Sequence, residues 1–256
     1  LSLNVSKTKY IIFHMPQRKI MDLDIKINGT SIDRVRCFNF LGITLNENLT
    51  WNDHINKISN KISRNIGILN NLKNLLPEKP KLHIYNSLVL SHLNFGILLW
   101  GHKCERVLKL QKKAVRIVKN VKFNAHTEPI FKNLNLLRID DILKLQELKF
   151  YFKSRNNLLP FYLQNIPLLH INEIHYHNTR GYREMRYPLI KHEYARKYIR
   201  YSIPETVNQT PACILNKIVT HSLQGFSKYI KTHFVNAYQK DCKKGKKEEC
   251  YVCSTR

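Results

Sequence analysis

The stretch that decides the fold is CERVLKLQKKAVRIVKNV, residues 104–121. Its apolar residues recur at spacings of three and four, which is the repeat of an amphipathic α-helix. At about 100° per residue, its basic residues lie on the opposite side and span roughly a third of the circumference. The stretch therefore predicts a helix with one face in a core and one positive face. The apolar positions are Val107, Leu110, Ala114, Ile117, Val118 and Val121, and the basic positions are Lys109, Lys112, Lys113, Arg116 and Lys119.

Helical periodicity extends to both sides of this stretch. Thr50 and Asp53 can form a capping box at the start of a long helix. Pro77 and Pro80 then break the chain, and Pro80 suits the first turn of a helix that we expect to run to about Trp100. A fourth helix is expected at about 139–156. The first helix places on one face Ile55, Ile58, Ile62, Ile66, Leu69, Leu72 and Leu76, and the fourth buries Ile142, Leu145, Leu148 and Phe152.

Residues 1–48 have a strand pattern. A short apolar run at 10–13 has strand length, and residues 24–32 alternate around Asn28-Gly29, a pair that tolerates positive φ and predicts a tight hairpin. Another apolar run, 38–45, is interrupted by Gly42. The stretch 240–247 is charged and expected to be loose. Beyond Pro160, further prolines, Pro204 among them, punctuate short segments, and periodicity returns only near 212–238.

The predicted fold class is mainly α, in three parts. They are a short β-hairpin segment at 1–48, a helical bundle at 49–160 and a basic, Tyr/Arg-rich helical extension at 161–256.

The charge of the chain points to a polyanionic partner. Its 256 residues include 43 Lys and Arg against 18 Asp and Glu, a formal net charge of +25. Nucleic acid is the usual partner of such a surface, because each neutralised phosphate releases counterions. An anionic membrane surface is the competing partner, but no 18-residue apolar run is present. The apolar faces are also committed to a helical core, so we expect no membrane partner.

The basic face of residues 104–121 favours phosphate contact over a merely solvated surface. All five charges have one sign, and we expect no acidic partner at i,i+4 to relieve their repulsion. The preceding long helix adds Lys57, Lys61 and Arg64 on one side. These eight residues are therefore candidate nucleic-acid contacts.

Residues 176–201 interleave basic and aromatic side chains. Tyr rings can stack on unpaired bases while Arg and Lys hold the backbone. The alternative is a surface whose tyrosines cover neighbouring helices, and the two interpretations stay open. Arg180, Arg183 and Arg186 are the candidate contacts. The interleaved set is Tyr176, Arg180, Tyr182, Arg183, Arg186, Tyr187, Lys191, Tyr194, Arg196, Lys197, Tyr198, Arg200 and Tyr201.

No catalytic residue is assigned. Asp140 and Asp141 are adjacent, as Mg²⁺-binding carboxylates of polymerases can be, but they open an amphipathic helix, where negative charge suits the helix dipole. No P-loop, His-Glu-x-x-His or nucleophile elbow is present. We expect the chain on its own to catalyse nothing.

Cys250 and Cys253 have the spacing of half a zinc knuckle, with Cys242 and His233 as further candidate ligands. The outer spacing is irregular and the ligand set incomplete, which disfavours Zn²⁺. The remaining cysteines are isolated and no secretory apolar segment opens the chain. We therefore expect an intracellular protein with reduced thiols, in the nucleus or in a cytoplasmic ribonucleoprotein, and not a secreted one.

Seven segments, in order along the chain, resemble the reverse transcriptases of non-LTR (LINE-type, jockey-like) retrotransposons. Singly each motif is weak, and together they are fairly specific. They are LNVSKTKYIIF (3–13), FNFLGI (38–43), WNDHI (51–55), LWG (99–101), LQKKAVR (110–116), NAHTEP (124–129) and NTR (178–180).

The resemblance implies the edge of a polymerase palm at 1–48, a helical thumb at 49–160 and a post-thumb region. It places Lys7 near the incoming nucleotide and Phe40, Leu41 and Gly42 at the primer grip. The catalytic aspartates of that family, which hold Mg²⁺, lie upstream of the position matching Leu1. We therefore expect a carboxy-terminal part of an RNA-directed DNA polymerase, which binds RNA or an RNA–DNA hybrid and works with the palm and fingers of its parent protein. No cofactor is expected in this chain itself.

Three alternatives remain. The chain could act as a polymerase through a partner that supplies the palm, which an Asp-Asp turn encoded just upstream would support. It could be a stand-alone RNA-binding or scaffold protein domesticated from such an element. It could also be a transposon relic without function.

Overall fold

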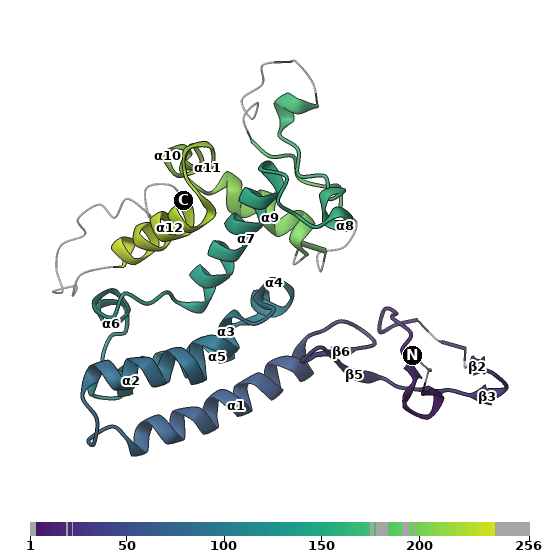
Figure 1. The fold of residues 1–256 in the computed structure, drawn as a ribbon, viewed down its shortest axis with the longest axis horizontal. Coiled ribbons are helices and arrows are strands. Elements are labelled where there is room, and N and C mark those ends of the chain that lie inside the picture. The colour runs from purple at the N-terminus through teal and green to yellow at the C-terminus, as the bar shows by residue number, and fades with distance from the viewer. Residues whose placement is uncertain are drawn as a thin grey trace. The chain divides into compact units, whose positions relative to one another are not determined.

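The computed structural model describes residues 4–18, 20–21, 23–174, 177, 184–190, 195–196 and 198–238. The chain divides into two compact units, Leu1–Lys61 and Ile62–Arg256. The division falls inside helix α1 (Asn52–Asn71). Helices dominate the described residues, so the predicted mainly α class is confirmed (Figure 1). The boundaries expected at 48 and 160 stay predictions.

The first unit carries short paired strands. Asn28 and Gly29 have φ values of 50° and 78°, which form the predicted two-residue turn between β2 and β3. This turn confirms the hairpin predicted at 24–32. Strand β1 pairs in parallel with β4, with Lys9 opposite Asp33. The strands are β1 (Lys9–Tyr10), β2 (Lys26–Ile27), β3 (Thr30–Ser31), β4 (Asp33–Arg34), β5 (Cys37–Phe40) and β6 (Ile43–Asn46).

The interruption at Gly42 is a second tight turn. Leu41 and Gly42 have φ values of 46° and 86°, so β5 and β6 form an antiparallel hairpin. The end of this hairpin is tied to the start of α1 by Asn46. Its side-chain oxygen accepts the Thr50 backbone N–H at 2.9 Å, and its side-chain nitrogen donates to the Asp53 carboxylate at 2.9 Å. Asn46 thus links the strand pattern to the helical pattern that follows.

The second unit is a set of helices around α7, which contacts α4, α5, α9 and α12 (Figure 1). Its interior joins α7, α9 and α12, and the rings of Phe152 and Phe226 lie 5.0 Å apart there. The helices are α2 (Glu78–Tyr85), α3 (Ser91–Asn94), α4 (Ile97–Trp100), α5 (Glu105–Lys119), α6 (Glu128–Asn133), α7 (Ile139–Arg155), α8 (Phe161–Gln164), α9 (Ile199–Asn208), α10 (Ala212–Leu215), α11 (Lys217–Thr220) and α12 (Leu223–Ala237).

The prediction of one continuous helix from Pro80 to Trp100 is wrong. A π-helical segment, Asn86–Leu90, follows α2, and the helix ends at Asn94. Gly96 then adopts a left-handed φ of 62°, which glycine accepts without a Cβ clash. The carbonyl of Phe95, released from the helix ladder, accepts a hydrogen bond from Trp100 Nε1 at 2.9 Å. The expected core position is confirmed, because the apolar residues Tyr85, Val89, Leu93, Ile97 and Trp100 are buried.

Within the described residues, no single helix has the length and apolar character to cross a membrane. Glu78–Asn94 and Ile97–Lys103 meet that test only as a pair, and the pair is bent by 55°.

Pro204 does not punctuate a short segment as expected, because it lies inside α9. A proline at this position removes a backbone donor from the helix, which is ordinarily unfavourable. Its ring is buried, together with Ile203 and Val207, which places it in the interior of the helical unit. Packing of this helix therefore overrides the local helix-breaking tendency.

Candidate nucleic-acid interface

Helix α5 is anchored on one side by its apolar residues. Val107, Ala114, Ile117 and Val118 are buried, as predicted, and Leu110 is partly buried. Gln111 is buried among them, where its amide donates to the Leu137 carbonyl at 2.9 Å and accepts the Ile139 N–H at 2.9 Å. The helix ends at Lys119, and the C-cap residue Asn120 that follows has a left-handed φ of 55°. This side therefore holds α5 against the start of α7.

Three lysines on the opposite side of α5 face outward, and we call them the lysine patch: Lys109, Lys112 and Lys113. Lys109 and Lys113 are exposed, and Lys112 is half-buried. Within the part of the chain that the structure describes, none of the three side chains makes a hydrogen bond or an ion pair. Their charges are therefore available to an external anion.

The last two basic residues of α5 make internal contacts. Arg116 Nε donates to the Ala125 carbonyl at 2.8 Å. Lys119 Nζ lies 2.8 Å from Glu78 Oε2 and 2.8 Å from Asn133 Oδ1. These cations also suit the negative end of the helix dipole. Their role as phosphate contacts stays a prediction, but part of their charge is already satisfied within the fold.

The expectation that no acidic residue stands four positions from the basic residues is wrong. Glu105 precedes Lys109 by four residues and opens α5. Its carboxylate makes no ion pair with Lys109 among the described contacts. Glu105 suits the positive end of the helix dipole, which accounts for its position.

The basic residues of α1 are Lys57 and Lys61 in the first unit and Arg64 in the second. Lys57 is half-buried, with its ammonium 3.5 Å from the Thr44 hydroxyl, and Lys61 and Arg64 are exposed. Beside them His54 is buried and accepts the Thr44 N–H at 3.1 Å. Burial and the nearby lysine charges lower the pKa of His54, so it adds no charge to this helix at neutral pH.

The residues that the resemblance placed at a primer grip form the tip of the β5–β6 hairpin. Phe40 and Leu41 are 57% and 79% exposed. Leu41 also holds a left-handed φ of 46°, which residues other than Gly, Asn and Asp rarely adopt. Lys7 lies on an exposed 3₁₀ turn, Val5–Lys7. The polymerase roles of these residues stay predictions.

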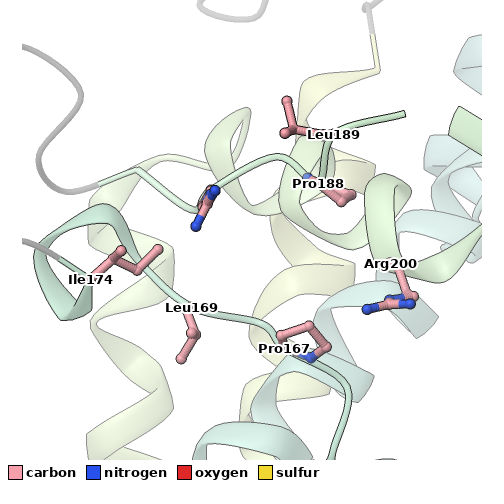
Figure 2. Close-up of a pocket in the computed structure, with 7 residues that line it drawn as sticks. Pro167, Leu169, Ile174, Pro188, Leu189 and Arg200 are labelled. Atoms are coloured by element: carbon pink, nitrogen blue, oxygen red, sulfur yellow. The ribbon is translucent and has the colours of Figure 1, made fainter. Parts of the chain in front are cut away.

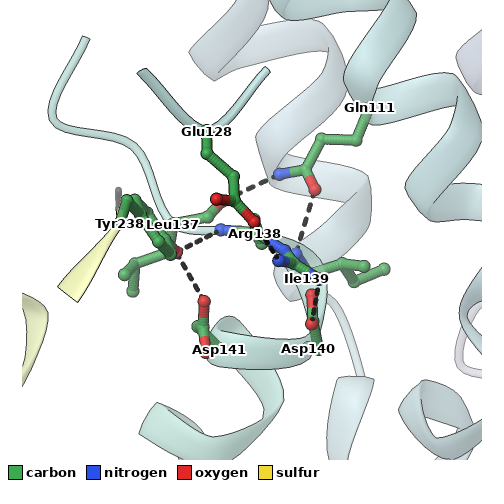
Figure 3. Close-up of polar contacts among 8 residues, drawn as sticks. All are labelled: Gln111, Glu128, Leu137, Arg138, Ile139, Asp140, Asp141 and Tyr238. Atoms are coloured by element: carbon green, nitrogen blue, oxygen red, sulfur yellow. Dashed lines mark hydrogen bonds and ion pairs between the residues drawn. The ribbon is translucent and has the colours of Figure 1, made fainter. Parts of the chain in front are cut away.

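Asp140 and Asp141 lie in the first turn of α7, as predicted (Figure 3). Arg138 Nη2 lies 2.7 Å from the Asp140 carboxylate. The half-buried Asp141 carboxylate accepts the Tyr238 hydroxyl at 2.5 Å, and that hydroxyl in turn accepts the Arg138 N–H at 3.0 Å. Burial raises the pKa of Asp141 above its ordinary value. These contacts use one oxygen of each carboxylate, Asp140 Oδ2 and Asp141 Oδ2, and tie both aspartates into the fold.

The same cluster is closed by the end of α12. Lys132 Nζ donates to the carbonyls of Asn236 and Tyr238, each at 3.2 Å. Glu128 Oε1 lies 3.4 Å from Arg138 Nη1. Residues from α6, α7 and α12 therefore share one polar network, which serves the fold.

The Tyr/Arg segment is only partly described. Arg180 and Arg183 lie outside the described residues, whereas Arg186 is described and exposed. The rings of Tyr187 and Tyr201 lie 5.1 Å apart, and the Arg196 guanidinium lies 5.9 Å from the centre of the Tyr201 ring. The tyrosines thus pack on each other in this structure, and base stacking by them stays a prediction.

Cys242, Cys250 and Cys253 lie outside the described residues, so the structure does not test the zinc interpretation. His233 on α12 is half-buried, and burial lowers its pKa. Among the residues that are described, no three His, Cys, Asp or Glu side chains gather into a metal-binding group.

Sequence reasoning missed Glu147, which is buried in α7. Its carboxylate accepts the Thr206 hydroxyl at 2.5 Å and lies 3.6 Å from His102 Nε2. Burial raises its pKa to about 7. A lone acidic residue between Leu143 and Phe150 on an otherwise apolar face was the signal that could have identified it.

Three proteins of Drosophila melanogaster are similar to part of this chain. The RNA-directed DNA polymerase from mobile element jockey is 27% identical over 143 residues, 53% of this chain and 15% of that protein. The probable polymerases from transposon X-element and transposon BS are 21% and 23% identical over 149 and 148 residues, in each case 55% of this chain and 16% of the relative. The resemblance to polymerases of non-LTR retrotransposons is confirmed.

The chain thus spans about a sixth of the length of the curated relatives it matches. No family model matches the chain, and no solved structure matches it.

Proposed function

We propose that this chain holds template RNA, or an RNA–DNA hybrid, for an RNA-directed DNA polymerase, and that the lysine patch of α5 contacts the phosphate backbone. The observation that carries this proposal is the contrast between the two sides of α5. One side is buried against the helical core, whereas Lys109, Lys112 and Lys113 face outward without internal partners among the described residues. The similarity to polymerases of mobile elements supports the same function.

Backbone contact is the form of recognition that suits this surface. Lysine ammonium groups neutralise phosphates and release counterions, and they read no base sequence. A polymerase must hold a duplex of any sequence, so contacts of this kind serve it well. Because the α5 backbone is fixed by its buried side, the three ammonium groups project from a rigid support.

In this proposal, other parts of the polymerase catalyse nucleotide addition. The adjacent aspartates of α7 are tied into the fold by Arg138 and Tyr238, so Mg²⁺ would be held by other carboxylates, on the palm of the parent polymerase. The palm and fingers are therefore partners of this chain, and Lys7 and the Phe40–Gly42 hairpin tip would contribute next to them. We place the assembly inside the cell, in the nucleus or in a cytoplasmic ribonucleoprotein.

The test is binding of a blunt RNA–DNA hybrid over a range of salt concentrations, for the wild type and for K109Q/K112Q/K113Q. Arg116 and Lys119 stay unchanged because they make internal bonds. We expect the plot of log affinity against log salt to become less steep by about 2 to 3, since each phosphate contact contributes about 0.9. Near physiological salt the variant should bind about tenfold or more weakly.

A matched control removes three lysines from other helices, in K149Q/K228Q/K231Q on α7 and α12. We expect the control to lose much less affinity than the patch variant at the same net charge. An equal loss in both variants would show a general charge effect and would contradict a specific role of α5. Unchanged binding by the patch variant would exclude the lysine patch as the contact surface.

A further inference from the structure

A small hollow opens between the segment that follows α8 and the start of α9 (Figure 2). Its volume is about 210 Å³, smaller than pockets that enclose a whole drug-sized ligand, which measure about 300–1,000 Å³. Its apolar lining includes Pro167, Leu169, Pro188 and Leu189, and two arginines, Arg186 and Arg200, complete it. It therefore suits one small group that combines an apolar part with an anionic part.

The backbone around the hollow is held by defined hydrogen bonds. The Arg186 N–H donates to the Leu169 carbonyl at 3.0 Å. Asn208 on α9 fixes the neighbouring Met185, accepting its N–H at 2.8 Å and donating to its carbonyl at 3.1 Å. Arg186 and Pro188 line the hollow together with Leu189, whereas Tyr187, between them, packs on the Tyr201 ring.

The two arginines of the hollow differ from other arginines of this unit. Arg138 and Arg155 are ion-paired, to Asp140 and Glu173. The side chains of Arg186 and Arg200 make no hydrogen bond or ion pair within the described part of the chain. Arg200 also lies in the first turn of α9, where the positive end of the helix dipole disfavours a cation. A bound anion would relieve both unfavourable features.

We propose that this hollow binds one unpaired nucleotide of a single-stranded nucleic acid. Its phosphate would bridge Arg186 and Arg200, because guanidinium groups bind phosphate oxygens through paired N–H donors. Its base would lie against Pro188 and Leu189, the latter being 95% exposed. The inference rests on the proposed function and extends it: α5 holds a duplex, and the hollow takes a single strand that continues from it.

A nucleotide fits these observations better than an acidic peptide does. A phosphodiester offers oxygens to two guanidinium groups at once, and a base offers a flat face to the proline and leucine side chains. The net charge of +25 also favours a polyanion over a single carboxylate.

The experiment compares two probes, a blunt RNA–DNA hybrid and the same hybrid with a short single-stranded RNA extension. The wild type should bind the extended hybrid about tenfold more tightly, the size of effect that one well-placed base provides. In R186Q/R200Q this preference should disappear, while affinity for the blunt hybrid stays within about twofold. R186K/R200K, which keeps the charge but loses the planar donors, should also lose most of the preference.

Folding is controlled by urea unfolding. Both arginine side chains lack partners among the residues that the structure describes, so R186Q/R200Q should keep the wild-type midpoint. A matched variant of equal charge, K228Q/K231Q on α12, should keep the preference for the extended hybrid.

The outcomes separate this inference from the proposed function. Retention of the preference in R186Q/R200Q would overturn the nucleotide site and leave the role of α5 intact. Loss of the preference in R186Q/R200Q, together with weaker binding of the blunt hybrid by K109Q/K112Q/K113Q, would support both. If the wild type fails to bind the blunt hybrid, the short RNA alone becomes the probe, and binding that does not depend on Arg186 and Arg200 overturns the site. Arginine-dependent capture of phosphatidylserine vesicles in place of RNA would overturn it as well.

Discussion

Two polar regions of the helical unit, the lysine patch of α5 and the network beneath it at the start of α7, use similar residues for opposite purposes. In the network, Arg138, Lys132 and Tyr238 each have a partner within the fold. In the patch, Lys109, Lys112 and Lys113 have none among the described residues. Position on the helical wheel of α5 does not decide which lysines have a partner, since Lys119 lies on the same arc as the patch and is bound to Glu78. Tertiary partners decide which charges are available for a ligand.

The largest effect should come from removing the side chain of Gln111, which bonds to the backbone on either side of Arg138 at the start of the network. Q111A would leave the Leu137 carbonyl and the Ile139 N–H without their partners and would open a cavity beside Tyr85. We expect the free energy of unfolding to fall by about 3 to 5 kcal/mol, measured by urea denaturation. The adjacent outward-facing change K112Q should lower it by less than about 0.5 kcal/mol. Similar values for the two variants would contradict the distinction between patch and network.

The second prediction concerns Glu147, whose buried carboxyl has a pKa of about 7 against 4.5 in the unfolded chain. The folded state holds this proton between those two pH values and the unfolded state does not. Stability from the group is therefore full below pH 4.5 and is lost as the pH rises through 7. E147Q keeps an acceptor for Thr206 and never ionises. At pH 8 it should be more stable than the wild type by about 2 to 3 kcal/mol, and at pH 4 about equal.

The measurement is the difference in unfolding midpoint between E147Q and the wild type across this pH range, which cancels the other titrating groups. The polar groups that face Glu147 are Thr206, Ser202, Glu205, Lys144 and His102. If protonated His102 stabilised an ionised Glu147, E147Q would instead be the less stable protein at pH 8. That result would reverse the prediction.

The smallest effects test the comparison within α5 itself. K119Q removes bonds to Glu78 and Asn133 and should lower stability by about 0.5 to 1 kcal/mol, the range for a partly exposed ion pair. K113Q should leave stability unchanged within about 0.5 kcal/mol and weaken hybrid binding. Unfolding curves and binding isotherms of both variants check the crossed pattern. Identical profiles for the two lysines would remove the basis for treating the ends of α5 differently.

Local patterns in the sequence predicted much of this fold. Helical spacing identified the buried residues Ile55, Ile62 and Ile66 of α1, and Asn28-Gly29 identified a hairpin turn. The break at Gly96 was missed because a single left-handed residue leaves the apolar pattern around it unchanged. Hydrophobic patterns indicate the periodicity of a helix or strand. They indicate a break in a helix only where several turn-forming residues lie close together in the sequence.

The candidate site was less predictable, because its partners are distant in the sequence. Lys119 is joined to Glu78, 41 residues away, which no local pattern reveals. The hollow unites Pro167, Pro188 and Arg200 through the pairing of two extended segments and the start of α9. Glu147 stood out in the sequence only as one acidic residue on an apolar face, and its partner Thr206 lies 59 residues further along the chain.

The bonds that Tyr238 makes have a consequence for the order in which the chain folds. Its hydroxyl reaches Asp141 across 97 residues, and Lys132 reaches its carbonyl across 106. During synthesis the start of α7 emerges long before the residue that seals it, so a nascent chain carries a carboxylate and a backbone N–H still open to water. Closure of so long a loop slows folding. We therefore expect the helical unit to reach its final state late, after α12 has been made, and to depend until then on protection from aggregation.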